Sequence, residues 1–531
     1  MPANGISAER RHEAPIGKVI VTERDLVISA DFGTSGVKIG IVDHSLKLIS
    51  RATATYPLSL AKGGIAEQAP DDWWAALARG LSDLRHEIPN LMERTGALVM
   101  STQLCGVICA DETGHALRPC LTWLDKRAAP IGRALTGGFP EVHGYQVFKL
   151  ARWLRIANGA PAKNGMDPTA KFLWIAQNEP EIYARTRWFL DVKDWLVHRA
   201  TGRFTTSAES ANLSWLMDTR PGREGWSQTL ANVVGIPLEK MPEIVDAAEI
   251  VGTLTPQAAA ELGLRADVPV LGGASDVTAA ALGSGEVSDG ALHISAATSA
   301  WIAGFMPSRL LSVAHSYATI TSALNYRPLL IASQENAGSA LEWGVRISGG
   351  RVDGEALAHA FADMGSPEID DPYFLPWLAG ERVPVDNDAL RGVFHGLALH
   401  HDDRAIRRAT LEGVALNLRW SYSKVCKEKP VKTDGPIGMV GGVSANPAFA
   451  QTIADALNRE VRVGGSRHAG VLGAATLAAP VMGWAETPWK AAEALRANTN
   501  AHYVPNPSRV EELDRRATHL AKIRKHILRS Y

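Results

Sequence analysis

The strongest constraint on the fold comes from residues 26–43, LVISADFGTSGVKIGIVD, where two apolar runs flank a short turn. The runs 26–30 and 37–42 consist mainly of aliphatic and β-branched residues, which is the composition of strands buried on both faces. Gly33 and Gly36 permit the positive φ angles of a tight turn. The pattern therefore predicts a β-hairpin with buried strands.

The turn of this hairpin has the groups that a metal-bound polyphosphate needs. Backbone N–H groups of a glycine turn can approach an anion closely, Thr34 and Ser35 add hydroxyl donors, and Lys38 adds a positive charge. Asp31, at the end of the first strand, offers oxygen to a hydrated Mg²⁺. An ordinary tight hairpin is the alternative, and this stretch alone leaves both interpretations open.

Composition and charge restrict the class of partner. The chain has 531 residues and a formal net charge of -1, so we expect no basic surface for nucleic acid or for an anionic membrane. Its 4 cysteines form no CxxC pair, which fits a cytoplasmic protein without a disulfide framework or a zinc site. Residues 1–24 lack the apolar region of a signal peptide, so we expect a disordered extension there. Small-molecule partners are therefore predicted.

Predicted strands and helices alternate along the chain. A helix at 71–84 follows Pro70 and precedes a buried strand at 97–103, and a strand at 268–273 precedes a helix of small residues at 277–282. Residues 469–485 are weakly polar and rich in small residues, so we expect a buried, closely packed helix followed by a turn. This alternation predicts a layered α/β fold.

A second candidate group is Asp276, which follows the strand predicted at 268–273 after Ala274 and Ser275. In open α/β sheets, ligands meet catalytic groups outside the carboxyl ends of the strands. The alternative is that Asp276 caps the following helix, and one aspartate can have both roles.

Residues 291–305, ALHISAATSAWIAGF, repeat the opening pattern of strand, Thr-Ser turn and strand. Thr298 and Ser299 correspond to Thr34 and Ser35, which suggests two related halves. A chance match over a few residues is the alternative. The second turn has no acid and no lysine, so it would bind phosphate through N–H and O–H donors.

A glycine-rich turn, residues 441–447, lies between a strand predicted at 437–440 and a helix predicted at 448–457. Such a turn at a helix N-terminus can pack against a nucleobase or a ribose and orient a phosphate. A tight strand-to-helix connection is the alternative interpretation.

Taken in order, these motifs resemble the FGGY family of carbohydrate kinases, which shares a superfamily with actin and the heat-shock chaperones. The resemblance extends from Asp25 to Trp484 and includes EQAPDDWW, LRPCLTWLDKR, KFLWIAQNEPEIY, VKDWLVHRATG, GGASDVTAAALGSG, FLPWLAGERVP, RGVFHGLALHH and ATLEGVALNLR. The segments TWLDKR and FLPWLAGER are most similar to the xylulokinase branch.

The resemblance implies two RNase-H-like α/β domains around a deep cleft for nucleotide and sugar. The N-terminal domain, residues 25–284, would bind the sugar and contain the catalytic base. The C-terminal domain, residues 285–531, would bind the nucleotide and end in a helical tail.

The resemblance also implies roles for single residues. Asp276 would be the general base, and Mg²⁺ would be held by Asp31 through water and by Asp276. The sugar would contact Gln103, Leu104, Cys105 and Asp276. ATP would contact Thr34, Ser35, Gly36, Lys38, Thr298, Gly338, Gly442 and Asn446.

The predicted function is transfer of the γ-phosphate of ATP to a small sugar or polyol, with a pentulose such as D-xylulose as the favoured acceptor and Mg²⁺ as cofactor. A homodimer is compatible with the resemblance. Cys105 stands where the xylulokinase-like pattern has histidine, and Val277 where the family usually has an amide, so two strong polar contacts to a sugar are missing. Ala297 replaces the usual glycine before Thr298.

Three alternatives to a pentulose kinase stay open at this stage. The chain could phosphorylate another ketose or a polyol. It could be a catalytically weak sensor that binds nucleotide and sugar. An ATP hydrolase of the chaperone or actin type is disfavoured, because the sugar-kinase segments between the motifs are present.

Overall fold

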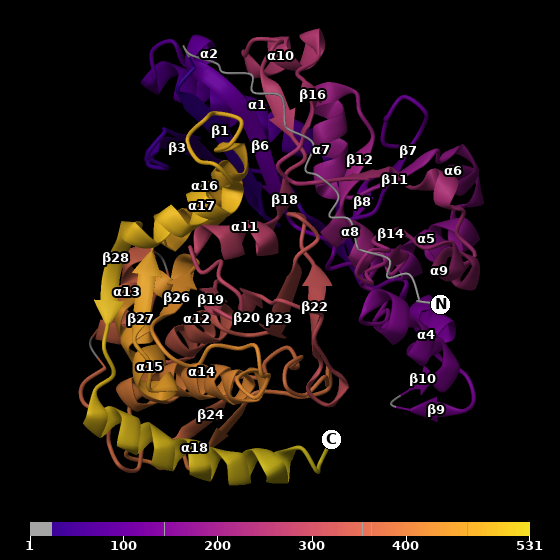
Figure 1. Cartoon of the computed structure of the whole chain (residues 1–531). Coiled ribbons are helices and arrows are strands. Elements are labelled where there is room, and N and C mark those ends of the chain that lie inside the picture. The colour runs from indigo at the N-terminus through magenta and orange to yellow at the C-terminus, as the bar shows by residue number, and fades with distance from the viewer. Residues whose placement is uncertain (1–23, 143, 353, 363, 465) are drawn as a thin grey trace, which may run out of the picture.

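The computed structural model describes residues 24–531 except 143, 353, 363 and 465, and it forms two α/β lobes (Figure 1). The predicted N-terminal extension, residues 1–24, lies outside the described residues except for Arg24. Each lobe contains one mixed sheet, and α11 (Asp276–Gly283) and α16 (Ala469–Ala478) lie between the lobes. The α/β prediction is confirmed.

The predicted hairpin forms the middle of the N-terminal sheet. The first strand of the hairpin, β1 (Leu26–Phe32), pairs antiparallel with the second, β2 (Gly36–Val42). On its opposite side β1 pairs parallel with β6 (Thr95–Thr102). In spatial order the strands are β16 (Ile250–Thr253), β17 (Pro269–Leu271), β6 (Thr95–Thr102), β1 (Leu26–Phe32), β2 (Gly36–Val42) and β3 (Leu48–Thr55). The short strand β18 (Ala274–Ser275) also pairs with β6 and ends directly before Asp276.

The C-terminal sheet repeats this arrangement. Its hairpin consists of β19 (His293–Ala296) and β20 (Ala300–Phe305), which pair antiparallel. The strand β19 also pairs parallel with β26 (Ile437–Val440), as β1 does with β6. In spatial order the strands are β21 (Leu311–Ser312), β22 (Tyr317–Thr321), β23 (Pro328–Gln334), β20 (Ala300–Phe305), β19 (His293–Ala296), β26 (Ile437–Val440), β27 (Val461–Gly464) and β28 (Thr499–Tyr503). The repeat noticed in the sequence is therefore also a repeat of strand pairing.

Helices cover both sheets and bury their apolar faces. The outer face of the N-terminal sheet packs on α1 (Pro70–Glu87), α7 (Val192–Thr201) and α10 (Pro256–Leu262). A lateral cluster in the same lobe contains α4 (Val147–Ala157), α5 (Pro168–Asn178) and α9 (Gln228–Val234). The C-terminal sheet packs on α12 (Gly338–Ile347), α14 (Asp403–Val425), α15 (Pro447–Leu457) and α18 (Pro507–Ile527).

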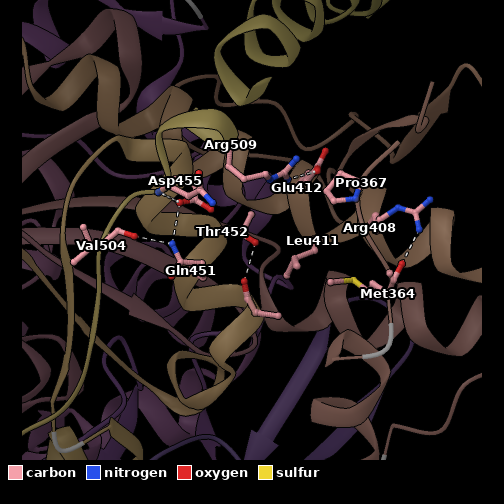
Figure 2. A pocket seen from close by; sticks show the side chains of 13 residues that line it. Met364, Pro367, Arg408, Leu411, Glu412, Gln451, Thr452, Asp455, Val504 and Arg509 are labelled. Atoms are coloured by element: carbon pink, nitrogen blue, oxygen red, sulfur yellow. Dashed lines mark hydrogen bonds and ion pairs between the residues drawn. The ribbon is translucent and has the colours of Figure 1, made fainter. Parts of the chain in front are cut away.

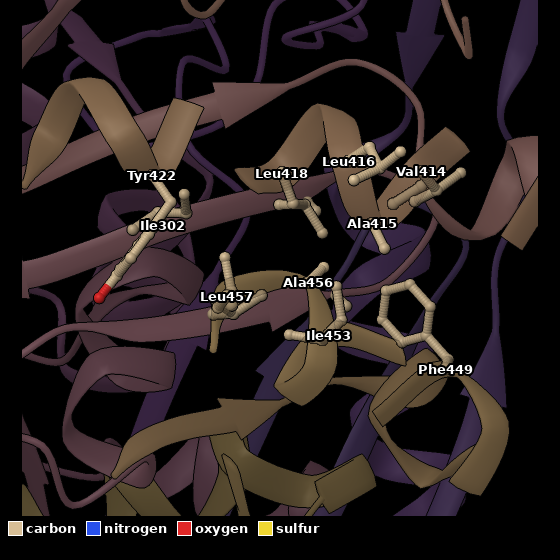
Figure 3. Packing of buried hydrophobic residues seen from close by; sticks show 14 of the residues in the cluster. Ile302, Val414, Ala415, Leu416, Leu418, Tyr422, Phe449, Ile453, Ala456 and Leu457 are labelled. Carbon is tan, nitrogen blue, oxygen red and sulfur yellow. The ribbon is translucent and has the colours of Figure 1, made fainter. Parts of the chain in front are cut away.

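The core of the C-terminal lobe is densely filled between its helices. Figure 3 shows Val414, Leu418 and Tyr422 of α14 facing Ile453 and Leu457 of α15 across this core. All of them are less than 9% exposed. This packing holds the strand-to-helix turn before α15 in a fixed position relative to the sheet.

The helix α16 belongs by sequence to the second half of the chain but packs on the N-terminal sheet. It contacts β1, β6 and α11, and the hydroxyl of Ser29 in β1 donates to the carbonyl of Val471 at 2.7 Å. The two helices cross so closely that a Cβ on Gly473 would lie 1.8 Å from the Ala279 carbonyl oxygen. The prediction of a buried, closely packed helix after residue 469 is confirmed.

No helix in the described part of the chain is both long and apolar enough to cross a membrane.

Candidate active site

Hydrogen bonds and close packing fix the backbone of the turn in the first hairpin, and the side chains of Ser35 and Lys38 are exposed. The Gly33 N–H donates to the Gly36 carbonyl at 3.0 Å, and a Cβ on Gly36 would lie 2.7 Å from the Ala54 carbonyl oxygen. Thr34 is bound by two neighbours: Trp123 Nε1 donates to its hydroxyl at 3.0 Å and Gln68 Nε2 to its carbonyl at 2.8 Å. Ser35 and Lys38 are exposed, so their donors are available to an anion.

Asp31 lies between this turn and the N-terminus of α16. Its Oδ1 accepts the hydroxyl of Ser101 at 2.8 Å, and a Cβ on Gly470 would come within 2.4 Å of its Oδ2. Burial raises the pKa of Asp31, and the charge of Lys38 and the bond from Ser101 oppose this rise. The carboxylate therefore faces the first turn of a helix, where a negative charge is stabilised.

Cationic residues gather beside the same turn. Lys38 Nζ donates to the Arg467 carbonyl at 3.5 Å, and Arg51 Nη1 lies 2.5 Å from His468 Nε2. Burial together with Arg51, Lys38 and Arg467 lowers the pKa of His468 to about 4, so the imidazole is neutral at pH 7. Of this group only Lys38 was predicted from the sequence, because no local pattern connects residues 467 and 468 to the hairpin.

Asp276 is the first residue of α11 and is half-buried. The cap of this helix is Ser275, whose hydroxyl accepts the Thr278 N–H at 3.2 Å. The alternative that Asp276 is the cap is therefore wrong. Burial, followed by repulsion from Asp31, Glu209 and Asp191, raises the pKa of Asp276 to about 8.

The loop after β6 contains the three residues expected to meet the sugar. Cys105 has a φ of 63°, and its N–H and that of Gly106 donate to Asp191 at 3.2 and 2.9 Å. Burial raises the pKa of the Cys105 thiol, so it is uncharged at neutral pH. Leu104 is partly exposed beside it.

Gln103 connects this loop to the phosphate turn. Its Nε2 donates to Gln68 Oε1 at 2.8 Å, and Gln68 in turn donates to the Thr34 carbonyl. The Oε1 atom of Gln103 is buried and accepts no hydrogen bond from the described residues. An unsatisfied buried acceptor is costly.

Two residues that build this part of the site were not predicted from the sequence. Gln68 belongs to the segment EQAPDDWW, and Lys171 to KFLWIAQNEPEIY, but neither segment indicated a contact with the loop. Lys171 is fully buried and donates to the carbonyls of Cys105 and Thr122 at 2.9 and 2.8 Å. Membership of these segments was the only signal, since both contacts depend on tertiary packing.

The turn of the second hairpin is attached to the N-terminus of α12. The Thr298 carbonyl accepts N–H donors from Ala337 and Ser339, and the Gly338 N–H donates to Ala297 at 2.8 Å. A Cβ on Gly338 would lie 2.4 Å from the Ala297 carbonyl oxygen, which explains glycine at that position. Ala297 itself is exposed and lies outside the left-handed region, so its methyl group causes no backbone strain.

The two glycines of the turn before α15 have different roles. Gly441 has a φ of 99°, and a Cβ there would lie 2.3 Å from the Ala296 carbonyl oxygen, so this residue makes the close approach to the hairpin. Gly442 is exposed and has no atom within 4 Å of a built Cβ. Asn446 caps α15, because its Oδ1 accepts the Phe449 N–H at 3.1 Å, which leaves its amide nitrogen available.

The two groups of turns meet at the helices between the lobes. Ala280 of α11 packs with Val440 at the end of β26 and with Ala469 at the start of α16. Asp31 and Asp276 are therefore brought together with the glycine-rich turn on one side and the first hairpin on the other. This arrangement joins acidic groups, backbone donors and a cationic edge, which are the parts required to hold a polyphosphate.

A cavity of about 470 Å³ lies away from these residues, between α14, α15 and α18 (Figure 2). Its charged groups are paired within the protein: Arg509 Nη2 donates to Glu412 at 2.7 Å, and Gln451 Nε2 to Asp455 at 2.9 Å. None of the site residues expected from the sequence lines it.

Comparison with known proteins gives a consistent result. The model of the FGGY family of carbohydrate kinases matches with its N-terminal domain at residues 26–283 and with its C-terminal domain at residues 293–482. A xylulose kinase of Escherichia coli (strain K12) is 29% identical over 462 residues, 85% of this chain and 89% of the relative. A gluconokinase of Bacillus subtilis (strain 168) is 25% identical over 464 residues, 85% of this chain and 86% of the relative. The crystal structure of a xyloylose kinase from Brucella ovis has a TM-score of 0.82 and 26% identity, and the match covers 95% of this chain and 100% of that one.

Proposed function

Since the chain belongs to the FGGY family of carbohydrate kinases, we propose that it phosphorylates a pentulose such as D-xylulose with ATP, using Asp276 as the general base. The position of Asp276 is the observation on which this proposal depends. It begins α11 beside Asp31, and its pKa of about 8 lies close to the pH at which a cytoplasmic enzyme operates. A base with such a pKa combines a useful deprotonated fraction with a strong affinity for the proton.

In the proposed reaction, the hydroxyl oxygen of the sugar forms a bond to the γ-phosphorus while the bond from that phosphorus to the β–γ bridging oxygen breaks. Asp276 accepts the hydroxyl proton, and ADP leaves with the electron pair of the broken bond. Such a transfer requires positioning and charge neutralisation more than covalent help. Ser35, Lys38 and the backbone of Gly36 are the donors on the N-terminal side.

The remaining predicted ATP contacts are donors or open backbone on the C-terminal side. Gly338 begins α12 and would present its helix N-terminus to the phosphates, with Thr298 next to it. The unobstructed Gly442 and the amide nitrogen of Asn446 would border the adenosine.

Asp31 and Asp276 fit a hydrated Mg²⁺ in the chemistry of their donors. Both are carboxylates, burial raises the pKa of both, and Asp31 repels the charge of Asp276. Oxygen ligands and retained waters are what Mg²⁺ prefers, and a cation would relieve this repulsion. When bound, the ion neutralises charge on the phosphates of ATP.

The polar groups around the loop after β6 favour a neutral polyhydroxyl acceptor over a sugar acid. Asp31, Asp191 and Asp276 are acidic, Lys171 already binds two carbonyl groups, and Arg382, whose charge also reaches Cys105, pairs with Glu335. A carboxylate substrate would therefore meet repulsion without a dedicated partner. The buried Oε1 of Gln103 and the uncharged thiol of Cys105 are compatible with sugar hydroxyls. A cytoplasmic location, predicted from the cysteine content, and a homodimer, predicted from the resemblance, remain predictions.

An acceptor panel tests this proposal. Purified protein with ATP and Mg²⁺ is supplied with D-xylulose, other ketoses, aldoses, polyols and D-gluconate, and phosphorylated products are identified by mass spectrometry. We expect the highest kcat/KM with a pentulose. Bound ATP without any phosphorylated product contradicts the kinase reaction, and a higher kcat/KM for D-gluconate than for every ketose contradicts the acceptor class.

A further inference from the structure

A buried acid that the proposed reaction does not use lies against the first turn of α11, which begins with Asp276. Glu209, on α8 (Ala208–Leu213), has an exposed fraction of 0%. Its carboxylate accepts the backbone N–H of Ser275 and, at 2.5 Å, the hydroxyl of Thr278. Ser275 is the cap of α11 and Thr278 lies in its first turn, so Glu209 binds the helix on both sides of Asp276.

These contacts explain how a carboxylate can be buried there. An isolated buried charge is strongly unfavourable, whereas hydrogen bonds and a nearby opposite charge offset the loss of water. The first N–H groups of a helix have no partner within the helix and attract an anion. Burial raises the pKa of Glu209, while Thr278, Ser275 and the charge of Lys193 oppose that rise and favour the carboxylate.

We propose that Glu209 is a positioning residue for Asp276: its two hydrogen bonds fix the first turn of α11, from which the base extends. This inference rests on the proposed role of Asp276. Because the contacts come from a different element, α8, the position of the base depends on the packing of α8 against α11 as well as on α11 itself.

Three acids from different parts of the N-terminal lobe lie around Asp276. Asp31 faces it from β1, Asp191 from the residue before α7, and Glu209 from α8, and all three repel its negative charge. The helix α16, which packs on α11, contains no titratable residue. On α17 (Pro488–Ala494), Lys490 and Glu493 pair with each other at the surface at 3.3 Å.

Substitution can test these two hydrogen bonds. Glu209→Gln keeps both of them, because its amide can accept the Ser275 N–H and donate to the Thr278 hydroxyl. Thr278→Val removes one of the two anchoring bonds. Thr278→Ser keeps the hydroxyl and is the matched control.

The test measures kcat, KM and the melting temperature of wild type, Glu209→Gln, Thr278→Val, Thr278→Ser and Asp276→Asn, with ATP and D-xylulose or whichever acceptor of the panel gives product. Glu209→Gln should keep kcat within about threefold of wild type, because both hydrogen bonds to α11 are retained.

Thr278→Val should lose roughly tenfold in kcat with little change in KM, because a displaced base reacts more slowly. Thr278→Ser should recover most of that loss. A purely structural role would lower the melting temperature of Thr278→Val and leave its kcat at the wild-type value, and this result overturns the proposal. Should Glu209→Gln not fold, equal kcat values for Thr278→Val and Thr278→Ser overturn it instead.

The variant Asp276→Asn distinguishes failure of this inference from failure of the proposed function. If Asp276→Asn turns over at the wild-type rate, Asp276 is not the base and both proposals are wrong. If Asp276→Asn is inactive while Thr278→Val keeps the wild-type kcat, only the role of Glu209 is refuted.

Discussion

Replacement of Gly473 by alanine should weaken both the stability and the turnover of the enzyme. Alanine in a helix interior is usually favoured over glycine by about 1 kcal/mol. Here its Cβ would lie 1.8 Å from the Ala279 carbonyl oxygen and 2.6 Å from the Gly283 nitrogen, and both are backbone atoms that no rotamer change can move. Overpacking of this kind costs about 1–3 kcal/mol, so we expect net destabilisation.

Separation of α11 and α16 would also reach the active site. Asp276 begins α11, and Gly470, at the start of α16, touches Asp31. A misplacement of about 1 Å at a reacting group can cost on the order of 10²-fold in rate, so kcat should fall more than the stability loss alone explains.

Urea unfolding gives the free energy of unfolding of Gly473→Ala, and steady-state kinetics gives its kcat. Gly464→Ala is the matched control, because the nearest atom to a Cβ there is the Asn498 carbonyl oxygen at 3.8 Å. Its stability should stay within about 0.5 kcal/mol of wild type. A Gly473→Ala variant with wild-type stability and kcat would refute the argument that the two helices need this glycine.

Three further predictions concern the site itself. Asp276→Asn should lower kcat by about 10² to 10⁴ and leave ATP affinity nearly unchanged, as measured by single-turnover kinetics and calorimetry; wild-type turnover would exclude the base assignment. The kcat/KM of the wild type should fall as the pH drops below the pKa of about 8 of Asp276, because its carboxyl group is then protonated and cannot accept the hydroxyl proton; a pH-independent kcat/KM from pH 6 to 9 would contradict this. Lys171→Met should cost about 1–3 kcal/mol in urea unfolding, because the carbonyls of Cys105 and Thr122 lose their common donor; unchanged stability would show that water replaces it.

Local patterns predicted the elements well where strands and turns are defined by their own residues. The strand at 437–440 is β26 with the predicted bounds, and the helix predicted at 448–457 is α15, which begins one residue earlier at Pro447. Hydrophobic runs, glycines and prolines set these bounds within a few neighbouring residues. The predicted helix at the start of 469–485 was correct, but periodicity cannot show which sheet a buried helix packs on, and α16 covers the N-terminal one.

The candidate site was predicted where a turn motif concentrates the chemistry, as in the first hairpin and after the strand that ends before Asp276. Glu209, Gln68 and Lys171 were missed because their contacts join residues far apart in sequence, and single polar side chains give no periodic signal. Asn446 shows the opposite case: the resemblance implied a ligand contact, while the structure also uses its Oδ1 as a helix cap.

The position of α16 has a consequence for the synthesis of the chain. The bond from Ser29 to Val471 spans 442 residues. The face of β1 that packs on α16 therefore stays uncovered until almost the whole protein has been translated. At about 5–20 residues per second this delay is roughly 20 to 90 s, during which apolar strand surface stays available to other chains. We therefore expect chaperones at the ribosome to bind the nascent N-terminal lobe. A chain truncated before residue 469 should aggregate, although it contains every residue of the first sheet.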